Sequence, residues 1–207
     1  YTNESEQERA ADVGLILDGR QRTNMIGERS IFEHSVMAVA AMADTFLNAG
    51  NRVGLLFYGR QVTWTAPGYG RIQSERILHE LSMITPGDTL NFNELYVPRH
   101  LFPSRSQLVV FSPLIAEDYD ILTALRMRGY HLLVISPDPV AFETAGMAKT
   151  RSNNLASRIV HIQRDLLLRR LRGSGIHIVN WDTSQPFEKI AKSELEQRLV
   201  LPRGGLR

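Results

Sequence analysis

Six short segments of the chain carry the hydrophobic patterns of β-strands. They cover residues 12–17, 52–58, 61–65, 107–112, 131–136 and 176–180. Unbroken apolar runs between polar and turn residues are typical of parallel strands that are buried on both faces. Residues 61–65 alternate instead, and Gly59 and Arg60 before them form too short a link for a parallel crossover. We therefore expect a mainly parallel sheet in the order 3-2-1-4-5-6, with only residues 61–65 antiparallel, at its edge.

Helical segments separate the predicted strands, which favours a doubly wound α/β sheet with helices on both faces. We expect helices over residues 30–47, 71–84, 117–128, 156–172 and 186–199, and a shorter one over 92–102 that Pro98 interrupts. The apolar residues expected to face the core are Ile72, Ile77, Leu78 and Leu81 in the second helix, and Ile159, Ile162, Leu166, Leu167 and Leu171 in the helix over 156–172. The arginines of that helix are expected on a solvated face. Residues 137–154 show weak periodicity and are predicted as a loop or lid.

Composition and charge narrow the class of protein. The 207 residues suit one domain, expected over 11–200, with a polar extension at 1–10 and a tail at 201–207. No apolar stretch reaches the roughly 18 residues that span a bilayer, so we expect a soluble domain without direct membrane contact. The polar start without Met indicates a piece of a longer protein. The net charge of +2 with dispersed arginines argues against nucleic acid, and the absence of cysteine excludes disulfides and thiolate metal sites.

The first apolar run ends on a carboxylate. Asp18 follows residues 13–17 directly, and Arg20 and Arg22 come soon after it. In a parallel sheet the last residue of a buried strand lies at the carboxyl edge, where ligands of open α/β sheets bind. Asp18 is therefore the first candidate for a functional site. Its alternative role is structural, as a side chain that caps and orients the following loop.

Seven stretches of the chain together carry a family resemblance. They are residues 12–18, 32–36, 50–59, 85–90, 108–112, 125–131 and 175–182. In these stretches the chain resembles the von Willebrand factor A-type (VWA-like) domain of the DUF58 family, most specifically over residues 52–59. The resemblance implies a VWA-like fold, with the position of a metal-ion-dependent adhesion site at the carboxyl edge of the sheet.

The residues at that position depart from the pattern of the superfamily. The pattern is Asp-x-Ser-x-Ser in a first loop, Thr in a second and Asp in a third. Asp18 matches the first Asp and Thr89 the Thr, but Arg20 and Arg22 replace both serines, and Ser112 is followed by Pro113 in place of Asp. Because guanidinium groups repel a divalent cation, we expect a degenerate site without metal, where Arg20 or Arg22 neutralises Asp18. The candidate binding residues are Asp18, Arg20, Arg22, Thr89 and Ser112, and this edge is expected to be neutral or positive.

Two acidic residues, Glu117 and Asp118, follow the third loop. They could act as substitute acids, but we expect them to serve the N-terminus of the next helix. Motifs of dinucleotide sites, P-loops, serine hydrolases and zinc proteases are absent, and the six histidines show no ligand spacing. We therefore expect neither catalytic residues nor a cofactor.

These observations together favour a non-catalytic protein-interaction module that uses the loops at the carboxyl edge. The resemblance implies a larger membrane-anchored protein, with this domain on its cytoplasmic face and a MoxR-type AAA+ ATPase as partner. Two alternatives stay open. A phosphate- or nucleotide-dependent enzyme would use Arg20 and Arg22 to hold an anion and would show a deep pocket with convergent acids or bases. A Mg²⁺-dependent adhesion domain would respond to metal.

Overall fold

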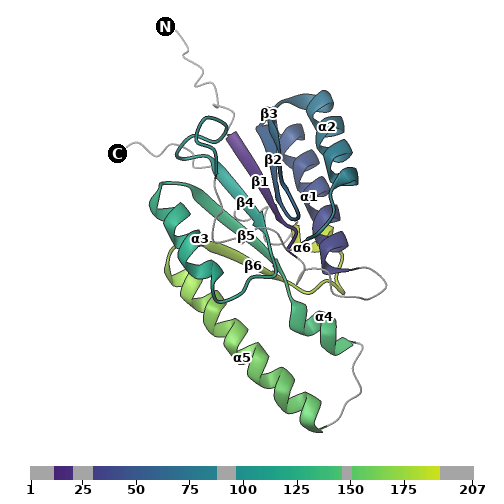
Figure 1. Ribbon diagram of the computed structural model, residues 1–207, viewed down its shortest axis with the longest axis vertical. Helices are drawn as coiled ribbons and strands as arrows, with labels where there is room; N and C mark the ends of the chain where they lie inside the picture. The colour runs from purple at the N-terminus through teal and green to yellow at the C-terminus, as the bar shows by residue number, and fades with distance from the viewer. Residues whose placement is uncertain (1–11, 21–29, 88–96, 146–150, 192–207) are drawn as a thin grey trace, which may run out of the picture.

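Six strands form one sheet at the centre of the molecule (Figure 1). They are β1 (Asp12–Asp18), β2 (Arg52–Tyr58), β3 (Val62–Gly68), β4 (Gln107–Phe111), β5 (His131–Pro137) and β6 (His177–Trp181). This computed structural model describes residues 12–20, 30–87, 97–145 and 151–191. The strand order is β3-β2-β1-β4-β5-β6, and only β2 and β3 pair antiparallel. The order and the antiparallel edge strand predicted from the sequence are confirmed.

Helices cover both faces of the sheet (Figure 1). One face packs against α1 (Ile31–Asn48), α2 (Gly70–Met83) and α6 (Phe187–Ile190), and the other against α3 (Asp118–Met127) and α5 (Arg151–Gly173). Alternation along β1 sends Leu15 and Leu17 into the first core and Ile16 into the second, and all three are fully buried. Burying such a side chain contributes roughly 1.5–3 kcal/mol, so the two cores hold the sheet in place.

The carboxyl ends of the central strands meet at one edge. Asp18 pairs with Tyr58 of β2, and Leu17 pairs with Phe111 of β4. The Gly19 N–H donates to the Tyr58 carbonyl at 2.6 Å, and the Gly87 N–H donates to the Gly19 carbonyl at 2.9 Å. These bonds join the loop after β1 to β2 and to the segment after α2, so that segments far apart in the sequence converge beside Asp18.

Three local predictions are corrected between β2 and α5. Strand β3 continues through Pro67 to Gly68, because an edge strand tolerates the missing N–H of proline and the β2–β3 pairing shifts register here. Residues 97–102 form turns and not the end of a helix, while residues 92–96 lie outside the described part of the chain. The expected loop over 137–154 contains α4 (Pro139–Ala145), whose first N–H groups are capped by Asp138, and α5 begins at Arg151.

The orientations predicted for two helices are partly wrong. In α2, Ile77 and Leu81 are buried as expected, but Ile72 and Leu78 are exposed. In α5, Leu171 is buried and Leu167 half-buried, whereas Ile159, Ile162 and Leu166 are exposed. The arginine face of α5 is not wholly solvated either, because Arg164 is buried.

Only part of the last predicted helix falls within the described residues, as α6 over Phe187–Ile190. The expected extension at 1–10 and the tail at 201–207 lie outside the described residues. The domain boundaries therefore stay a prediction.

Candidate functional site

Asp18 ends β1 at the middle of the carboxyl edge, between β2 and β4. Only 1% of its surface is exposed. Its carboxylate accepts the Arg20 backbone N–H at 3.1 Å, so it turns the loop after β1 back over the strand end. The same bond places the Arg20 side chain beside the carboxylate. Asp18 therefore orients the loop, which is the structural role considered for it, and it also forms an ion pair with Arg20.

The Arg20 guanidinium lies between two carboxylates. Its Nε donates to Asp18 Oδ1 at 2.7 Å and its Nη2 to Asp18 Oδ2 at 2.6 Å. On the other side, Nη1 and Nη2 donate to Asp118 Oδ1 and Oδ2 at 2.8 and 2.9 Å. Asp118 is fully buried in the first turn of α3, 98 residues further along the chain. Paired bonds to each carboxylate match the planar fork of a guanidinium, which Lys could not reproduce.

Ser112 joins the loop after β4 to this pair. Its hydroxyl donates to Asp18 Oδ2 at 2.7 Å and accepts the Leu114 N–H at 3.1 Å. Asp118 Oδ2 accepts the Ile115 N–H at 2.9 Å. Leu114 has a positive φ of 57°, which turns the chain sharply between β4 and α3. Asp18, Arg20, Ser112 and Asp118 are called the edge cluster below, and it ties the loops after β1 and β4 to the start of α3.

Burial and pairing act in opposite directions on Arg20. Burial lowers its pKa, but the hydrogen bonds and charges of Asp118 and Asp18 outweigh that effect and raise its pKa above the usual value. The guanidinium therefore carries a permanent positive charge between the carboxylates. Aspartate and serine oxygens are ligands that suit Mg²⁺, and in the edge cluster the oxygens of Asp18, Asp118 and Ser112 accept hydrogen bonds from the guanidinium instead.

The structure brings together three of the five residues proposed from the sequence, namely Asp18, Arg20 and Ser112. Of the two arginines considered as partners of Asp18, Arg20 forms the ion pair. Arg22 and Thr89 lie outside the described residues. Asp118 lies in the first turn of α3, as expected, and it also pairs with Arg20, a role that sequence reasoning did not assign to it.

A second buried arginine holds α5 against the same edge. The Arg164 guanidinium donates to the Pro113 carbonyl at 2.6 Å, to Asn180 Oδ1 at 2.8 Å and to Ser136 Oγ at 2.9 Å. Its Nε lies 3.5 Å from Asp138 Oδ1. Burial lowers its pKa, partly offset by the charges of Asp138 and Asp165, but a guanidinium stays charged at neutral pH. Arg164 therefore links α5 to the ends of β4, β5 and β6, and helical periodicity carried no signal for this role.

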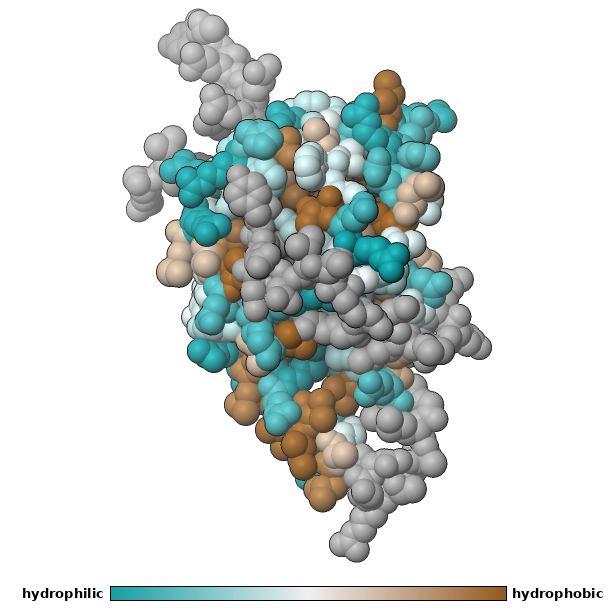
Figure 2. All heavy atoms as spheres, viewed as in Figure 1, coloured by the Kyte–Doolittle hydropathy of each residue, from teal (hydrophilic) through white to brown (hydrophobic). Residues whose placement is uncertain are grey.

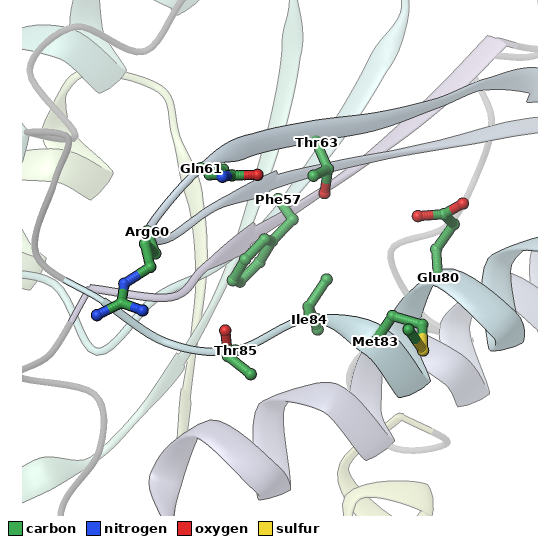
Figure 3. A pocket seen from close by; sticks show the side chains of 8 residues that line it. All are labelled: Phe57, Arg60, Gln61, Thr63, Glu80, Met83, Ile84 and Thr85. Carbon is green, nitrogen blue, oxygen red and sulfur yellow. The ribbon is translucent and has the colours of Figure 1, made fainter.

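A small pocket lies apart from the edge cluster, between the β2–β3 hairpin and the end of α2. Its volume is about 230 Å³, and its walls include Phe57, Thr63 and Met83. Figure 3 shows the charged side chains of Arg60 and Glu80 at opposite ends of the pocket, with the Phe57 ring between them. The acids and bases of this pocket therefore do not converge on one point.

Comparison with known proteins identifies the family. The model of the family described as "Protein of unknown function DUF58" matches residues 1–143. The chain belongs to the DUF58 family. No curated protein shows significant sequence similarity to it.

Solved structures show the fold that this DUF58 chain shares. It is similar to the VWA domain of SpRpn10, with a TM-score of 0.58, 14% identity, and coverage of 92% of this chain and 99% of that one. An aerotolerance-related membrane protein from Bacteroides fragilis NCTC 9343 gives a TM-score of 0.51 at 15% identity, covering 91% and 100% of the two chains. The conserved hypothetical protein BatB from Bacteroides thetaiotaomicron gives 0.50 at 14% identity, covering 88% and 98%. The VWA-like fold is therefore confirmed. Among the described residues of the DUF58 chain, no helix is long and apolar enough to cross a membrane.

Proposed function

We propose that this DUF58 domain is a non-catalytic protein-interaction module whose carboxyl-edge loops contact a partner without a metal ion. The observation that carries the proposal is the Arg20 guanidinium, which lies between Asp18 and Asp118 where a bridging cation would be needed. The proposal also draws on the VWA-like fold, whose carboxyl edge is the expected binding edge.

The edge cluster supports a metal-independent mode of binding. A Mg²⁺ ion in an adhesion site keeps a coordination position open for a carboxylate of the partner. In Arg20, by contrast, Nε, Nη1 and Nη2 all donate to Asp18 or Asp118. Arg20 thus orders the loops from inside, and the partner is expected to contact exposed residues around it, such as Arg60 and Glu117.

The same geometry argues against the enzyme alternative. An anion-binding role for Arg20 would need donors directed to solvent, but its guanidinium is directed at the two carboxylates. The pocket beside the β2–β3 hairpin separates Arg60 from Glu80, which does not suit acid–base catalysis at one substrate atom (Figure 3). A Mg²⁺-dependent adhesion domain is disfavoured because Arg20 brings a positive charge to the cation position.

The proposal also covers the location of the domain in the cell and the protein that it binds. A larger membrane-anchored protein with this domain on its cytoplasmic face, working with a MoxR-type AAA+ ATPase, is the setting that the family resemblance implies. The similar structure from Bacteroides fragilis is that of an aerotolerance-related membrane protein, which supports the anchored setting.

A binding titration tests the proposal. The chain is titrated with a nucleotide-free MoxR-type ATPase from the same organism, in Mg²⁺ and in EDTA, and we expect the same Kd in both. Arg60→Glu and Glu117→Arg, both exposed at the carboxyl edge, should each weaken binding at least about tenfold, as a like-charge contact in an interface costs a few kcal/mol. The matched control is Arg128→Glu, which is exposed between α3 and β5 at the amino edge. Loss of binding in EDTA, or an equal effect of Arg128→Glu, would contradict the proposal.

A further inference from the structure

Helix α5 carries an apolar stripe on its exposed side. The stripe consists of Leu155, Ile159, Ile162 and Leu166, with exposed fractions from 50% at Ile159 to 61% at Leu155. Figure 2 shows apolar side chains gathered over the lower end of the molecule, where Figure 1 places α5. Scattered exposed apolar residues are ordinary, but a continuous row of four large ones on one helix indicates a contact surface.

The stripe points away from the domain. Successive residues of a helix are about 100° apart, so positions spaced 4, 3 and 4 residues apart fall on one narrow line. The buried residues Arg164, Leu168 and Leu171 fall on the opposite side of the helix. Because Arg164 and its partners fix this rotation of α5, the stripe cannot turn inward without breaking the buried network.

We propose that the stripe is a dimerisation surface, on which α5 of a second copy of this chain packs antiparallel. The spacing 4-3-4 is the a/d spacing of a coiled-coil seam. In an antiparallel pair centred between Ile159 and Ile162, Leu155 lies opposite Leu166 of the second copy, and Ile159 lies opposite Ile162 of the second copy. Every apolar residue of the stripe then meets another across the two-fold axis.

The charged residues beside the stripe favour an antiparallel second copy of the chain as the partner. Arg158 and Asp165 are exposed and flank the stripe on the same side, seven residues apart. In the antiparallel register that aligns the stripe, Arg158 of each copy lies beside Asp165 of the other, which gives two opposite-charge contacts. In a parallel pair the two residues of one copy would lie on the opposite side of the seam from those of the other copy, so Arg158 would not meet Asp165. A membrane surface would favour a row of basic residues alone beside the stripe, and Asp165 breaks that row.

The size of the surface sets the strength of the dimer. Four half-exposed residues per copy form a short seam, well below the area of an obligate interface. The dimer is therefore weak and concentration-dependent, and a protein that holds two copies in one membrane or assembly would strengthen it by raising their effective concentration.

Sedimentation of the 207-residue chain over a concentration series tests the proposal. We expect a monomer–dimer equilibrium, weakened at least tenfold by Ile162→Glu. The matched control is Val160→Glu, because Val160 has a similar exposed fraction of 46% but lies off the stripe, and it should leave the Kd within twofold. A monomer at every concentration, or equal effects of the two variants, would overturn the proposal.

Three further measurements test the register of the helix pair and the binding of the stripe to a membrane. Arg158→Glu and Asp165→Lys should each weaken the dimer, and the double variant should restore it. Because the chain has no cysteine, disulfides can report geometry. A mixture of Leu155→Cys and Leu166→Cys chains should cross-link, whereas Leu155→Cys chains alone should not; the reverse would overturn the antiparallel arrangement.

Cosedimentation of the monomer with phosphatidylserine vesicles, lost in Ile162→Glu but not in Val160→Glu, would assign the stripe to a membrane and overturn the proposal.

Discussion

Arg20 stands in a position where the superfamily pattern has serine, and its guanidinium supplies a charge that the serine could not. Both carboxylates beside it, Asp18 and Asp118, are buried and bond to it directly. Breaking a buried ion pair from one side typically costs roughly 3–5 kcal/mol, because the remaining charge is left uncompensated. The Arg20 guanidinium thus neutralises the two buried carboxylates, so the edge cluster is stable without a metal ion.

The first prediction is that Arg20→Ser turns the edge cluster into a cation site. The variant should be less stable than the parent in EDTA by roughly 3–5 kcal/mol. Millimolar Mg²⁺ should restore part of the loss, since at ten times its Kd an ion adds about 1.4 kcal/mol, or roughly 3–5 °C in Tm. The measurement is the Tm of parent and variant in Mg²⁺ and in EDTA. The parent should show no shift, and Arg60→Ser serves as an exposed control; a Mg²⁺-dependent rise in the parent would mean that the cluster already binds metal.

The second prediction concerns Arg164, whose guanidinium has acceptors on the ends of three strands. Arg164→Met keeps most of the volume but leaves Asp138 and the Pro113 carbonyl without this donor, so we expect a loss of roughly 3–5 kcal/mol. Urea unfolding gives the difference. Arg169→Met, on the exposed side of the same helix, should change the free energy of unfolding by less than about 0.5 kcal/mol. Equal losses in the two variants would show that Arg164 only packs.

The pairing of Asp18 with Arg20 could be foreseen from the sequence. The two side chains carry opposite charges, and they lie only two residues apart at the end of a strand, so each is within reach of the other. The role of Asp118 could not, because its place in the first turn of a helix is sufficient reason for an acidic residue there. Its contact with Arg20 depends on β4 lying beside β1 and on the turn at Leu114. Arg164 was missed because an arginine among exposed polar residues gives no signal of burial.

Strands were easier to predict than the orientation of helices. A buried parallel strand is apolar on both faces, so a continuous run such as residues 53–58 identifies it without further information. Helix α5 has apolar residues on opposite sides, Ile159 and Ile162 outward and Leu168 and Leu171 inward, and periodicity alone cannot rank the two sides. The polar contacts of Arg164 decide which side faces the sheet. The stripe left outside is the surface proposed to pair with a second copy.

The third prediction tests why α1 begins where it does. Ser30 Oγ accepts the Glu33 N–H at 3.1 Å, and the Glu33 carboxylate accepts the Ser30 N–H at 2.7 Å, which is a complete capping box. Ser30→Ala should lower the free energy of unfolding by about 1 kcal/mol. Thr45→Ala is the control in the same helix, because the exposed Thr45 hydroxyl only bonds to the carbonyl one turn back. If Thr45→Ala cost as much as Ser30→Ala, the cap would not be the cause.

The two arginine networks meet in the segment between β4 and α3. Ser112 bonds to Asp18 in the edge cluster, while the adjacent Pro113 carbonyl accepts from Arg164. The segment is therefore held from the β1 side by one network and from the α5 side by the other. Because these contacts come from both ends of the chain, the carboxyl edge should loosen as a unit when either network is broken.

A double-mutant cycle between Ser112→Ala and Arg164→Met measures that coupling. Ser112→Ala alone should cost roughly 1–3 kcal/mol, because it removes the donor to Asp18 and leaves the buried Leu114 N–H without its acceptor. Once either change has loosened the segment, the second has less ordered structure left to disrupt. The double variant should therefore lose less than the sum of the single losses, by roughly 0.5–3 kcal/mol. Ser112→Ala combined with Ser30→Ala at the start of α1 is the control, and those losses should add to within about 0.5 kcal/mol. Strict additivity of Ser112→Ala and Arg164→Met would mean that the two networks hold the edge independently.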